Sequence, residues 1–404
     1  MRTIGIEERR ARLARRHRLS ADAGQGEGVA DIVRDVVALH STDPASVFLS
    51  LLARDASLGV ADVERALYDD RSVLRMLGMR RTMWVVPVEL AAVVHGACTR
   101  AIDVRERKRL VQFLAEGGVT DEGDAWLAEV EEATMLALAA RGEAVATELA
   151  RDVAGLRERL HLGAGTRWEV VQGASSRVLF VLAASGRIVR ARPRGSWISS
   201  QYRWATTASW LPDNVDRGLT LLPKGVAQVE LVWKWLASFG PGSVADLAWW
   251  TGLPVGEVRR AVAELPTVEV DLGGTGGAGG AGDTGLVLAD DVEPVAPPAP
   301  SVTFLPALDP TIMGWKERSW YLGEHGPALF DRSGNAGPTV WWDGRVVGGW
   351  AQRKTGEVVV RLLEDVGAEV TDLAEVEAAR LQSRIGDVRV TPRFRTPMER
   401  ELSA

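Results

Sequence analysis

The sequence predicts an α+β protein with three similar helical segments followed by a smaller β-rich segment. Apolar residues at helical spacing, followed by a short β hairpin, occur three times in succession. After a Pro-rich stretch at residues 291–300, short β patterns replace most of the helical ones. Helices followed by a hairpin is the order of a winged helix. We therefore expect three tandem winged-helix domains at residues 1–117, 118–220 and 221–292, and a β-rich domain at residues 293–404.

The first segment begins with apolar helical patterns at residues 6–18 and 28–39. A further helix should begin at Pro44, because Asp43 before it is a good N-cap and proline is favoured in the first turn. Two β-rich runs, at residues 73–77 and 82–86, complete the first hairpin.

The second segment predicts helices at residues 125–140, 142–153 and 166–184, with hairpin strands at residues 188–190 and 197–204. Residues 142–150 and 240–248 share a glycine, an acidic residue and a Leu-Ala pair in register, which favours repetition of the unit.

The third segment has the clearest helix-turn-helix pattern. A helix at residues 226–239 precedes Ser243, which should cap the next helix, and Gly252 marks the turn before a helix at 255–265. The Gly-rich residues 273–285 should form a mobile wing tip.

The C-terminal segment predicts one helix at residues 371–385 among several short strands. The Trp342-Asp343-Gly344-Arg345 corner is a strong hairpin signal. The expected strands lie at residues 302–305, 339–342, 345–350, 358–362 and 388–390.

Composition excludes several classes of protein. No apolar run reaches the length of a membrane span. The Arg-rich N-terminus lacks the apolar stretch of a secretory signal, so we expect a cytoplasmic protein. The single Cys98 excludes a disulfide framework and a Cys-based zinc site, and the histidines have no metal-ligating companions at suitable spacing. We therefore expect no metal and no cofactor.

The formal net charge of −6 does not favour a polyanion as partner, but local patches decide that question. Arginines cluster in the first hairpin and in the second wing, whereas acidic residues gather elsewhere. This pattern is typical of a molecule with one basic face, although a cluster of this kind is also compatible with an ordinary solvated helix face.

The most suggestive stretch is Leu39-His40-Ser41-Thr42-Asp43-Pro44, which places an imidazole, a hydroxyl and a carboxylate at one turn. Two further motifs lie in the C-terminal segment. They are Phe304-Leu305-Pro306-Ala307-Leu308-Asp309-Pro310, with Gly314 and Arg318 downstream, and Pro338-Thr339-Val340-Trp341-Trp342-Asp343-Gly344-Arg345-Val346-Val347-Gly348-Gly349-Trp350.

Together these three motifs resemble the winged-helix DNA glycosylases of the AlkZ/YcaQ type, over almost the whole chain. The resemblance implies a C-shaped molecule that binds duplex DNA in its concavity. It also implies cleavage of the N-glycosidic bond of bulky N-alkylated purines, including interstrand crosslinks, without a cofactor. The role would be DNA repair or genotoxin resistance at the nucleoid.

The family's catalytic pair, usually Gln-x-Gln or Gln-x-Asp before Asp-Pro, falls here on His40 and Thr42, a departure at both positions. We expect His40 to accept a proton from the attacking water, since its ordinary pKa is about 6.5. Thr42 would orient that water, and the charge of Asp43 would stabilise the oxocarbenium-like sugar.

Each of these side chains also has a purely structural interpretation. Asp43 could be only a helix N-cap, His40 could interact with the last carbonyls of a helix, and Thr42 could close a turn. Asp309 and Arg318 could form a structural ion pair instead of contacting DNA.

DNA contacts are expected from basic and aromatic residues of the first hairpin, the second wing and the C-terminal hairpin. A structural interpretation, in which the tryptophans form a β core and the basic residues a solvated edge, stays open. The candidates are Arg80, Arg81, Arg192, Arg194, Trp342, Arg345, Arg353 and Lys354.

The partner is expected to be double-stranded DNA with alkylated purines, and no membrane. No heptad pattern or obvious dimerisation helix is present, so we expect a monomer. The alternative function is a non-catalytic winged-helix regulator that binds a specific DNA sequence.

Overall fold

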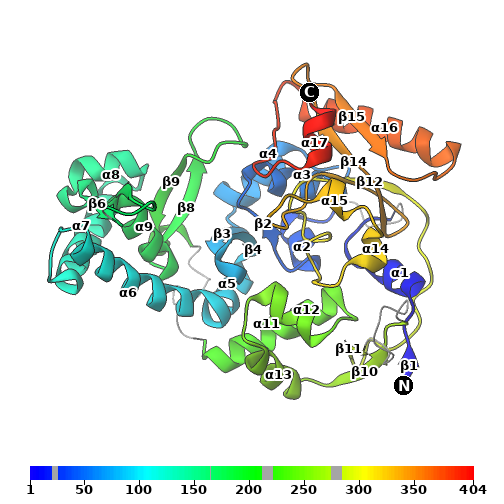
Figure 1. Ribbon diagram of the computed structural model, residues 1–404, viewed down its shortest axis with the longest axis horizontal. Coiled ribbons are helices and arrows are strands. Elements are labelled where there is room, and N and C mark those ends of the chain that lie inside the picture. Colours follow the sequence, from blue (N-terminus) through cyan, green and yellow to red (C-terminus); the bar gives the residue numbers. More distant parts are fainter. Residues whose placement is uncertain (21–25, 164, 212–221, 274–283) are drawn as a thin grey trace.

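A computed structural model describes residues 1–20, 26–163, 165–211, 222–273 and 284–404 (Figure 1). It is a mixed helix-and-sheet protein, as expected for an α+β chain. Helices followed by an antiparallel hairpin occur in three successive segments, and a four-stranded sheet follows. Residues 274–283, most of the expected wing tip, lie outside the described residues.

The first segment surrounds a three-stranded sheet of order β2-β4-β3. The expected hairpin is confirmed, with Arg75 opposite Val85 in the register. The expected helix at 28–39 is too long, because α2 ends at Asp35 and the chain then enters a short strand. The elements are β1 (Arg2–Thr3), α1 (Ile6–Arg16), α2 (Val29–Asp35), β2 (Leu39–His40), α3 (Pro44–Arg54), α4 (Val60–Glu64), β3 (Val73–Leu77), β4 (Met83–Pro87) and α5 (Ala91–Val94).

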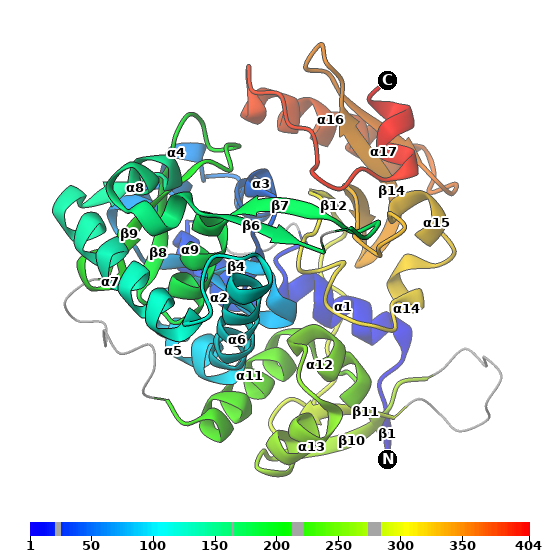
Figure 2. The same cartoon turned by 60° about the vertical axis from the view of Figure 1, so that its left-hand side comes forward.

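The second segment has its own apolar core and lies to one side of the remaining molecule in Figure 1. The expectation of a helix over 166–184 is wrong in its first part, because β6 and β7 form a hairpin that Figure 2 shows as a two-stranded ribbon. The elements are α6 (Arg100–Glu116), α7 (Gly123–Arg141), β5 (Glu143–Ala144), α8 (Ala146–Asp152), β6 (Arg159–Leu162), β7 (Val170–Gly173), α9 (Ala174–Ala184), β8 (Ile188–Pro193), β9 (Tyr202–Thr206) and α10 (Thr207–Trp210).

The third segment follows the sequence pattern closely. Ser243 caps α12 through the backbone N–H of Asp246, and Gly252 adopts the left-handed conformation (φ 73°) at the turn. The N-terminal strand β1 pairs in parallel with β10, so the chain start joins this segment. The elements are α11 (Lys224–Phe239), α12 (Val244–Thr251), α13 (Val255–Ala263), β10 (Thr267–Asp271) and β11 (Thr284–Leu288).

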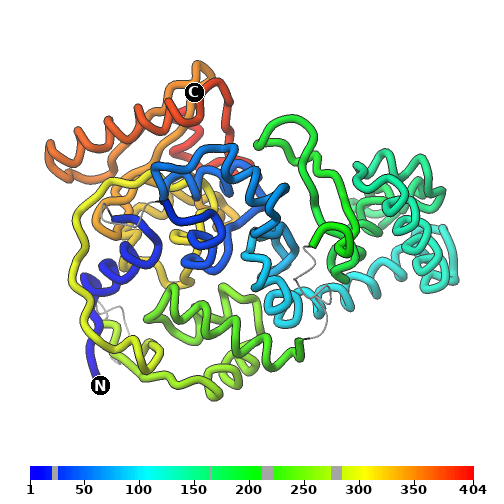
Figure 3. Tube along the Cα trace, turned by 180° about the vertical axis from the view of Figure 1, so that it is seen from behind, coloured from blue at the N-terminus to red at the C-terminus, as the bar shows by residue number. Residues whose placement is uncertain are grey.

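The C-terminal sheet has the order β12-β13-β14-β15, and its Asp343-Gly344 hairpin is confirmed by pairing of Trp342 with Arg345. Residues 388–390, expected as a strand, are not one, because they do not pair with this sheet. Figure 3 shows the chain after β11 following the edge of the molecule from the third segment to this sheet. The elements are β12 (Val302–Leu305), α14 (Ser319–Leu322), α15 (Gly326–Leu329), β13 (Thr339–Trp342), β14 (Arg345–Gln352), β15 (Val358–Leu362), α16 (Ala368–Ile385) and α17 (Pro397–Leu402).

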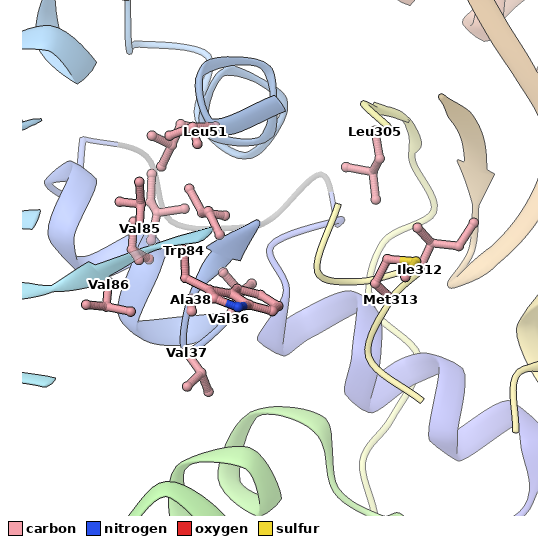
Figure 4. Close-up of a cluster of buried hydrophobic side chains, with 14 of the residues drawn as sticks. Val36, Val37, Ala38, Leu51, Trp84, Val85, Val86, Leu305, Ile312 and Met313 are labelled. Atoms are coloured by element: carbon pink, nitrogen blue, oxygen red, sulfur yellow. The ribbon is translucent and has the colours of Figure 1, made fainter. Parts of the chain in front are cut away.

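One apolar core joins the first segment, the third segment and the C-terminal segment, and β8, β9 and α10 of the second segment also contribute to it. Figure 4 shows part of it, where Leu51 of α3, Val85 of β4 and Ile312 belong to the same buried cluster. Burial of such side chains contributes about 1.5–3 kcal/mol each. The strand and the helix that flank the His40–Asp43 turn are therefore held rigidly from behind.

Candidate functional site

The turn that carries His40 and Thr42 lies between a strand and a helix. His40 pairs with Trp84 across the sheet, and the Ser41 N–H donates to the Met83 carbonyl over 2.8 Å. Placement of His40 at a helix C-terminus is therefore wrong, because Val37 takes a positive φ of 64° after α2 and the chain becomes extended.

His40 is partly exposed, and its ring centroid lies 4.8 Å from that of Trp84. Desolvation, with a smaller contribution from Arg80, lowers the pKa of His40 to about 3. The imidazole is thus neutral at physiological pH. The Thr42 N–H donates to its Nδ1 over a long 3.4 Å, which favours the tautomer with the proton on Nε2. In that tautomer His40 offers a hydrogen-bond donor, and it is a weaker base than the sequence suggested.

Thr42 reaches the surface with part of its side chain, but its Oγ1 is buried. Within the described residues this hydroxyl has no hydrogen-bond partner. An ordinary turn-closing role for the hydroxyl is therefore not what the structure shows. A buried hydroxyl without a partner costs about 1–3 kcal/mol, which is typical of a functional position.

Asp43 is confirmed as the N-cap of α3. Its Oδ1 accepts from the Ala45 N–H over 3.2 Å, and its Oδ2 accepts from the Arg393 N–H over 2.9 Å. Burial raises the pKa of Asp43, while these two hydrogen bonds act in the opposite direction. Both carboxylate oxygens thus accept hydrogen bonds from backbone N–H groups, and the bond from Arg393 fixes the C-terminal segment against the turn.

Behind the turn lies a buried guanidinium that sequence reasoning treated as surface charge. Arg75 is 2% exposed, and its Nε donates to the Ser41 Oγ over 2.6 Å. Its Nη1 donates to the Tyr68 hydroxyl over 3.1 Å, and its Cζ lies 4.6 Å from the Tyr202 ring centroid. In the described part of the chain, its Nη2 has no hydrogen-bond partner and no carboxylate pairs with it. The sequence did carry a signal for this burial, because Arg75 is the one charged residue in an otherwise apolar strand.

Beside the turn opens a cavity of about 690 Å³. It lies where the first segment, the β8–β9 hairpin, the start of α8 and the C-terminal segment meet. Ser41 and Thr42 line it, as do Arg190, Tyr202, Trp204 and Arg393. His40 is adjacent to this cavity in the chain but is not among the residues that line it.

The two predicted DNA contacts in the first hairpin differ in whether their guanidinium pairs with a carboxylate. Arg80 is exposed, and its guanidinium lies 4.2 Å from the ring centroid of Trp249. Arg81 instead forms an ion pair with the buried Glu106, with 2.9 Å between Nε and Oε1. Of the two, Arg80 is the one available to an external anion.

The two arginines predicted to contact DNA from the second segment are both paired. Arg192 binds Glu64 and Asp69 at 3.0 Å each, and Arg194 pairs with Glu148. These pairs join the β8–β9 hairpin to neighbouring elements and neutralise its charge. Contacts with DNA phosphates would have to replace them.

The C-terminal candidates are mostly engaged within the protein. Arg345 pairs with Glu364 and covers the half-buried Trp342, with 5.0 Å between Cζ and the ring centroid. Arg353 pairs with Glu357 at 2.7 Å, whereas Lys354 is exposed. Trp341 and Trp350 are buried core residues, at 1% and 3% exposure.

Among the described residues, no group of three or more His, Cys, Asp or Glu side chains could hold a metal ion. Within the same residues, no helix is long and apolar enough to cross a membrane. Cys98 is buried, and burial raises the pKa of its thiol to about 12. It is therefore not a reactive thiolate.

Comparison with known proteins identifies the family of this chain. Residues 33–384 match the family described as AlkZ-like DNA glycosylases. The chain belongs to this family. A solved structure, the Streptomyces sahachiroi DNA glycosylase AlkZ, superposes with a TM-score of 0.69 at 19% identity, covering 96% of this chain and 98% of that one. A search of curated proteins found no match.

Membership makes this AlkZ-like chain a DNA glycosylase, a hydrolase of DNA repair. The structural match shows that the mixed helix-and-sheet fold is shared with AlkZ.

Next to His40, this AlkZ-like protein carries a cation–aromatic arrangement that sequence reasoning missed. Arg318 lies between Trp249 and Phe330, at 5.0 and 4.8 Å from the ring centroids, and Arg80 covers Trp249 as well. Burial and the charge of Arg318 lower the pKa of Arg80. Asp309, which the sequence suggested as a partner of Arg318, binds Arg54 instead. In the described residues neither Arg80 nor Arg318 has a carboxylate partner, so their charge is free for an anion.

Proposed function

We propose that this glycosylase hydrolyses the N-glycosidic bond of bulky N-alkylated purines, including interstrand crosslinks, in duplex DNA. In this proposal the three helix–hairpin segments act as winged helices, and the C-terminal β domain closes a C-shaped molecule around the duplex at the nucleoid. The protein would act as a monomer, and the His40–Asp43 turn would be its catalytic site.

The observation that carries the proposal is the position of the turn. Its residues Ser41 and Thr42 line a cavity where three parts of the molecule meet, and within the described residues Arg80 and Arg318, on the His40 side, have no carboxylate partner. Anionic phosphates on either side of a modified nucleotide would find these cations first.

The reaction needs little general-acid catalysis from the protein. An N7- or N3-alkylated purine already carries positive charge and leaves readily, so the enzyme must position a water and stabilise the sugar cation. Neutral His40 would hold the water by donating from Nε2. Thr42 would accept from that water after one staggered rotation about χ1 brings its Oγ1 to the surface.

Asp43 would contribute its negative charge from behind the turn. Its oxygens are fixed by Ala45 and Arg393, so the charge cannot move toward the sugar as a nucleophile. A fixed carboxylate in a partly desolvated site stabilises a developing cation at a distance. This role also keeps the turn rigid.

The test is a glycosylase assay on duplexes with one N7-methylguanine, one bulky N7-alkylguanine or one interstrand crosslink. The expected result is release of the alkylated base, detected by mass spectrometry, together with alkali-labile abasic sites. Binding to alkylated DNA with no base release from any substrate would contradict the proposal.

A non-catalytic regulator is the second candidate, because both positions of the family's usual pair are substituted. That function predicts tight binding to one DNA sequence and no base release. Affinity that is independent of sequence would rule it out.

A further inference from the structure

The cavity beside Thr42 has walls of two kinds. Tyr202 and Trp204 of β9 supply aromatic surface, and each is only 9% exposed. Its volume, about 690 Å³, is in the range of sites that enclose drug-sized ligands. A single DNA phosphate would fill only a small part of such a space, whereas a bulky substituent on a base would fill much of it.

The charge of this cavity is set by arginines. Arg190 lines it, with its Cζ 5.5 Å from the Tyr202 ring centroid and 5.3 Å from that of Trp204. Its backbone pairs with Trp204, but in the described residues its guanidinium has neither a carboxylate partner nor a hydrogen bond. Arg194, in contrast, is neutralised by Glu148. Burial, the largest cause, lowers the pKa of Arg190 to about 10, which still leaves it charged at neutral pH.

A second guanidinium reaches the cavity from the C-terminal segment. Arg393 lines it and donates from Nη1 to the Thr42 carbonyl over 3.3 Å. Its charge also favours the ionised form of Asp43, which is itself turned to backbone donors and does not line the cavity. No Asp or Glu is among the lining residues of the described chain.

Two buried polar groups lie beside these arginines, one neutral and one positively charged. The Tyr202 hydroxyl, on a lining residue, is buried and has no hydrogen-bond partner in the described part of the chain. Arg75 lies against the same ring, fully charged and without a carboxylate. Groups of this kind are usually completed by a ligand or water.

We propose that this cavity receives the substituent on the alkylated purine and selects aromatic substituents that carry an acidic group. The proposal rests on the proposed glycosylase function and adds its substrate class. The ring of the substituent would pack on Tyr202 and Trp204, and its carboxylate or phenolate would accept charge-assisted hydrogen bonds from Arg190 and Arg393. An ammonium in the same position would be repelled, which is the basis of discrimination.

The experiment uses three duplexes with one N7-substituted guanine each, bearing benzyl, 4-carboxybenzyl or 4-(aminomethyl)benzyl. The three differ little in size and differ in charge. We expect wild-type protein to release the carboxybenzyl base at least about tenfold faster than the aminomethyl base, with the benzyl base between them. Equal rates for all three would overturn the proposal.

Variants at two positions of the β8–β9 hairpin make the test specific. In Arg190→Gln the carboxybenzyl preference should fall to less than about threefold, whereas Arg190→Lys should retain part of it. Arg203→Gln is the matched control, because Arg203 lies between Tyr202 and Trp204 on β9 but does not line the cavity. This variant removes the same charge and should keep the wild-type ratio. Thermal unfolding of each variant shows whether it is folded.

Binding measurements separate the remaining outcomes. Duplexes with the same adducts on a 2′-fluorinated sugar, whose glycosidic bond resists hydrolysis, give dissociation constants without cleavage. If no base is released but the carboxybenzyl duplex still binds at least about tenfold more tightly than the aminomethyl duplex, the glycosylase proposal fails and the cavity proposal stands. If Arg190→Gln weakens binding to all duplexes equally, including unmodified DNA, Arg190 contacts a phosphate and the cavity proposal fails.

Discussion

The two ends of helix α3 differ in how their buried polar groups are satisfied. At its C-terminal end, Arg54 donates to the His17 and Ser50 carbonyls, to Thr311 and to both oxygens of Asp309. At its N-terminal end, the Thr42 hydroxyl has no partner in the described residues.

The same contrast extends to the groups around each end. The Arg54–Asp309 pair is fully buried, and the Ser50 hydroxyl adds a further hydrogen bond to Asp309 over 2.6 Å. Around the turn, Arg75 and Tyr202 each keep a buried polar atom without a partner among the described residues. A satisfied network fixes one structure, whereas an incomplete one is costly unless something binds there. The comparison therefore assigns stability to one end of α3 and chemistry to the other.

The largest expected effect is on the satisfied end. Arg54→Met should lower the free energy of unfolding by about 3–5 kcal/mol, because it leaves the Asp309 carboxylate buried and unpaired. Urea unfolding followed by circular dichroism measures it. The double variant Arg54→Met/Asp309→Leu should recover part of the loss, since no charge stays buried. A single variant within about 1 kcal/mol of wild type would mean that the pair is not structural.

The next effect concerns the unsatisfied end. His40→Ala and Thr42→Ala should each lower the rate of base release on the order of 10²-fold, because water positioning is lost, and leave DNA affinity nearly unchanged. Single-turnover rates and fluorescence anisotropy measure the two quantities.

Conservative variants provide the control for that prediction. His40→Gln keeps a hydrogen-bond donor, and Thr42→Ser keeps the hydroxyl, so both should retain most of the rate. If the alanine variants are as active as wild type, the turn is not the catalytic site.

A smaller effect is expected at Asp43, whose carboxylate is fully hydrogen-bonded although it lies at the N-terminal end of α3. Asp43→Ala should destabilise the protein by about 0.5–2 kcal/mol through loss of the N-cap, and it should also release the backbone at Arg393. Asp43→Asn keeps an oxygen for the cap and should cost less. Chemical denaturation distinguishes the two variants, and equal losses would mean that the cap to Ala45 is not the main contribution.

The sequence predicts a structural feature well when the residues that form it are close together in the chain, and poorly when they are far apart. Local signals were sufficient for the Ser243 cap, the Gly252 turn and the Asp343-Gly344 hairpin, because each depends on neighbouring residues. Strand β7 fell inside the expected helix at residues 166–184, since it is short and its side chains follow no clear alternation of buried and exposed positions. The partner of Asp309 lies 255 residues away on Arg54, and no local pattern could show it.

The same distinction between local and distant interactions applies to the candidate site. The turn itself and the capping role of Asp43 followed from Asp-Pro before an apolar helix. The charges of Arg192 and Arg194 could not be assigned from composition, because both are neutralised by acidic residues distant in the chain. Arg75 and Arg190 carry the unpaired charge instead, and only tertiary packing distinguishes them from the paired arginines.

The smallest expected effect is an absence of pH dependence. A His40 with a pKa of about 3 is neutral throughout pH 5–8, so its titration should change the single-turnover rate by less than about threefold over that range. With an ordinary pKa of about 6.5, the neutral fraction, and with it the rate, would fall about thirtyfold between pH 8 and pH 5. Protein-free duplex at each pH corrects for spontaneous depurination. A rate that falls as the pH is lowered through 6.5 in wild type, but not in His40→Gln, would show that His40 titrates normally and acts as the base. That result would contradict the donor role, which the desolvation of His40 and its contact with the Thr42 N–H favour.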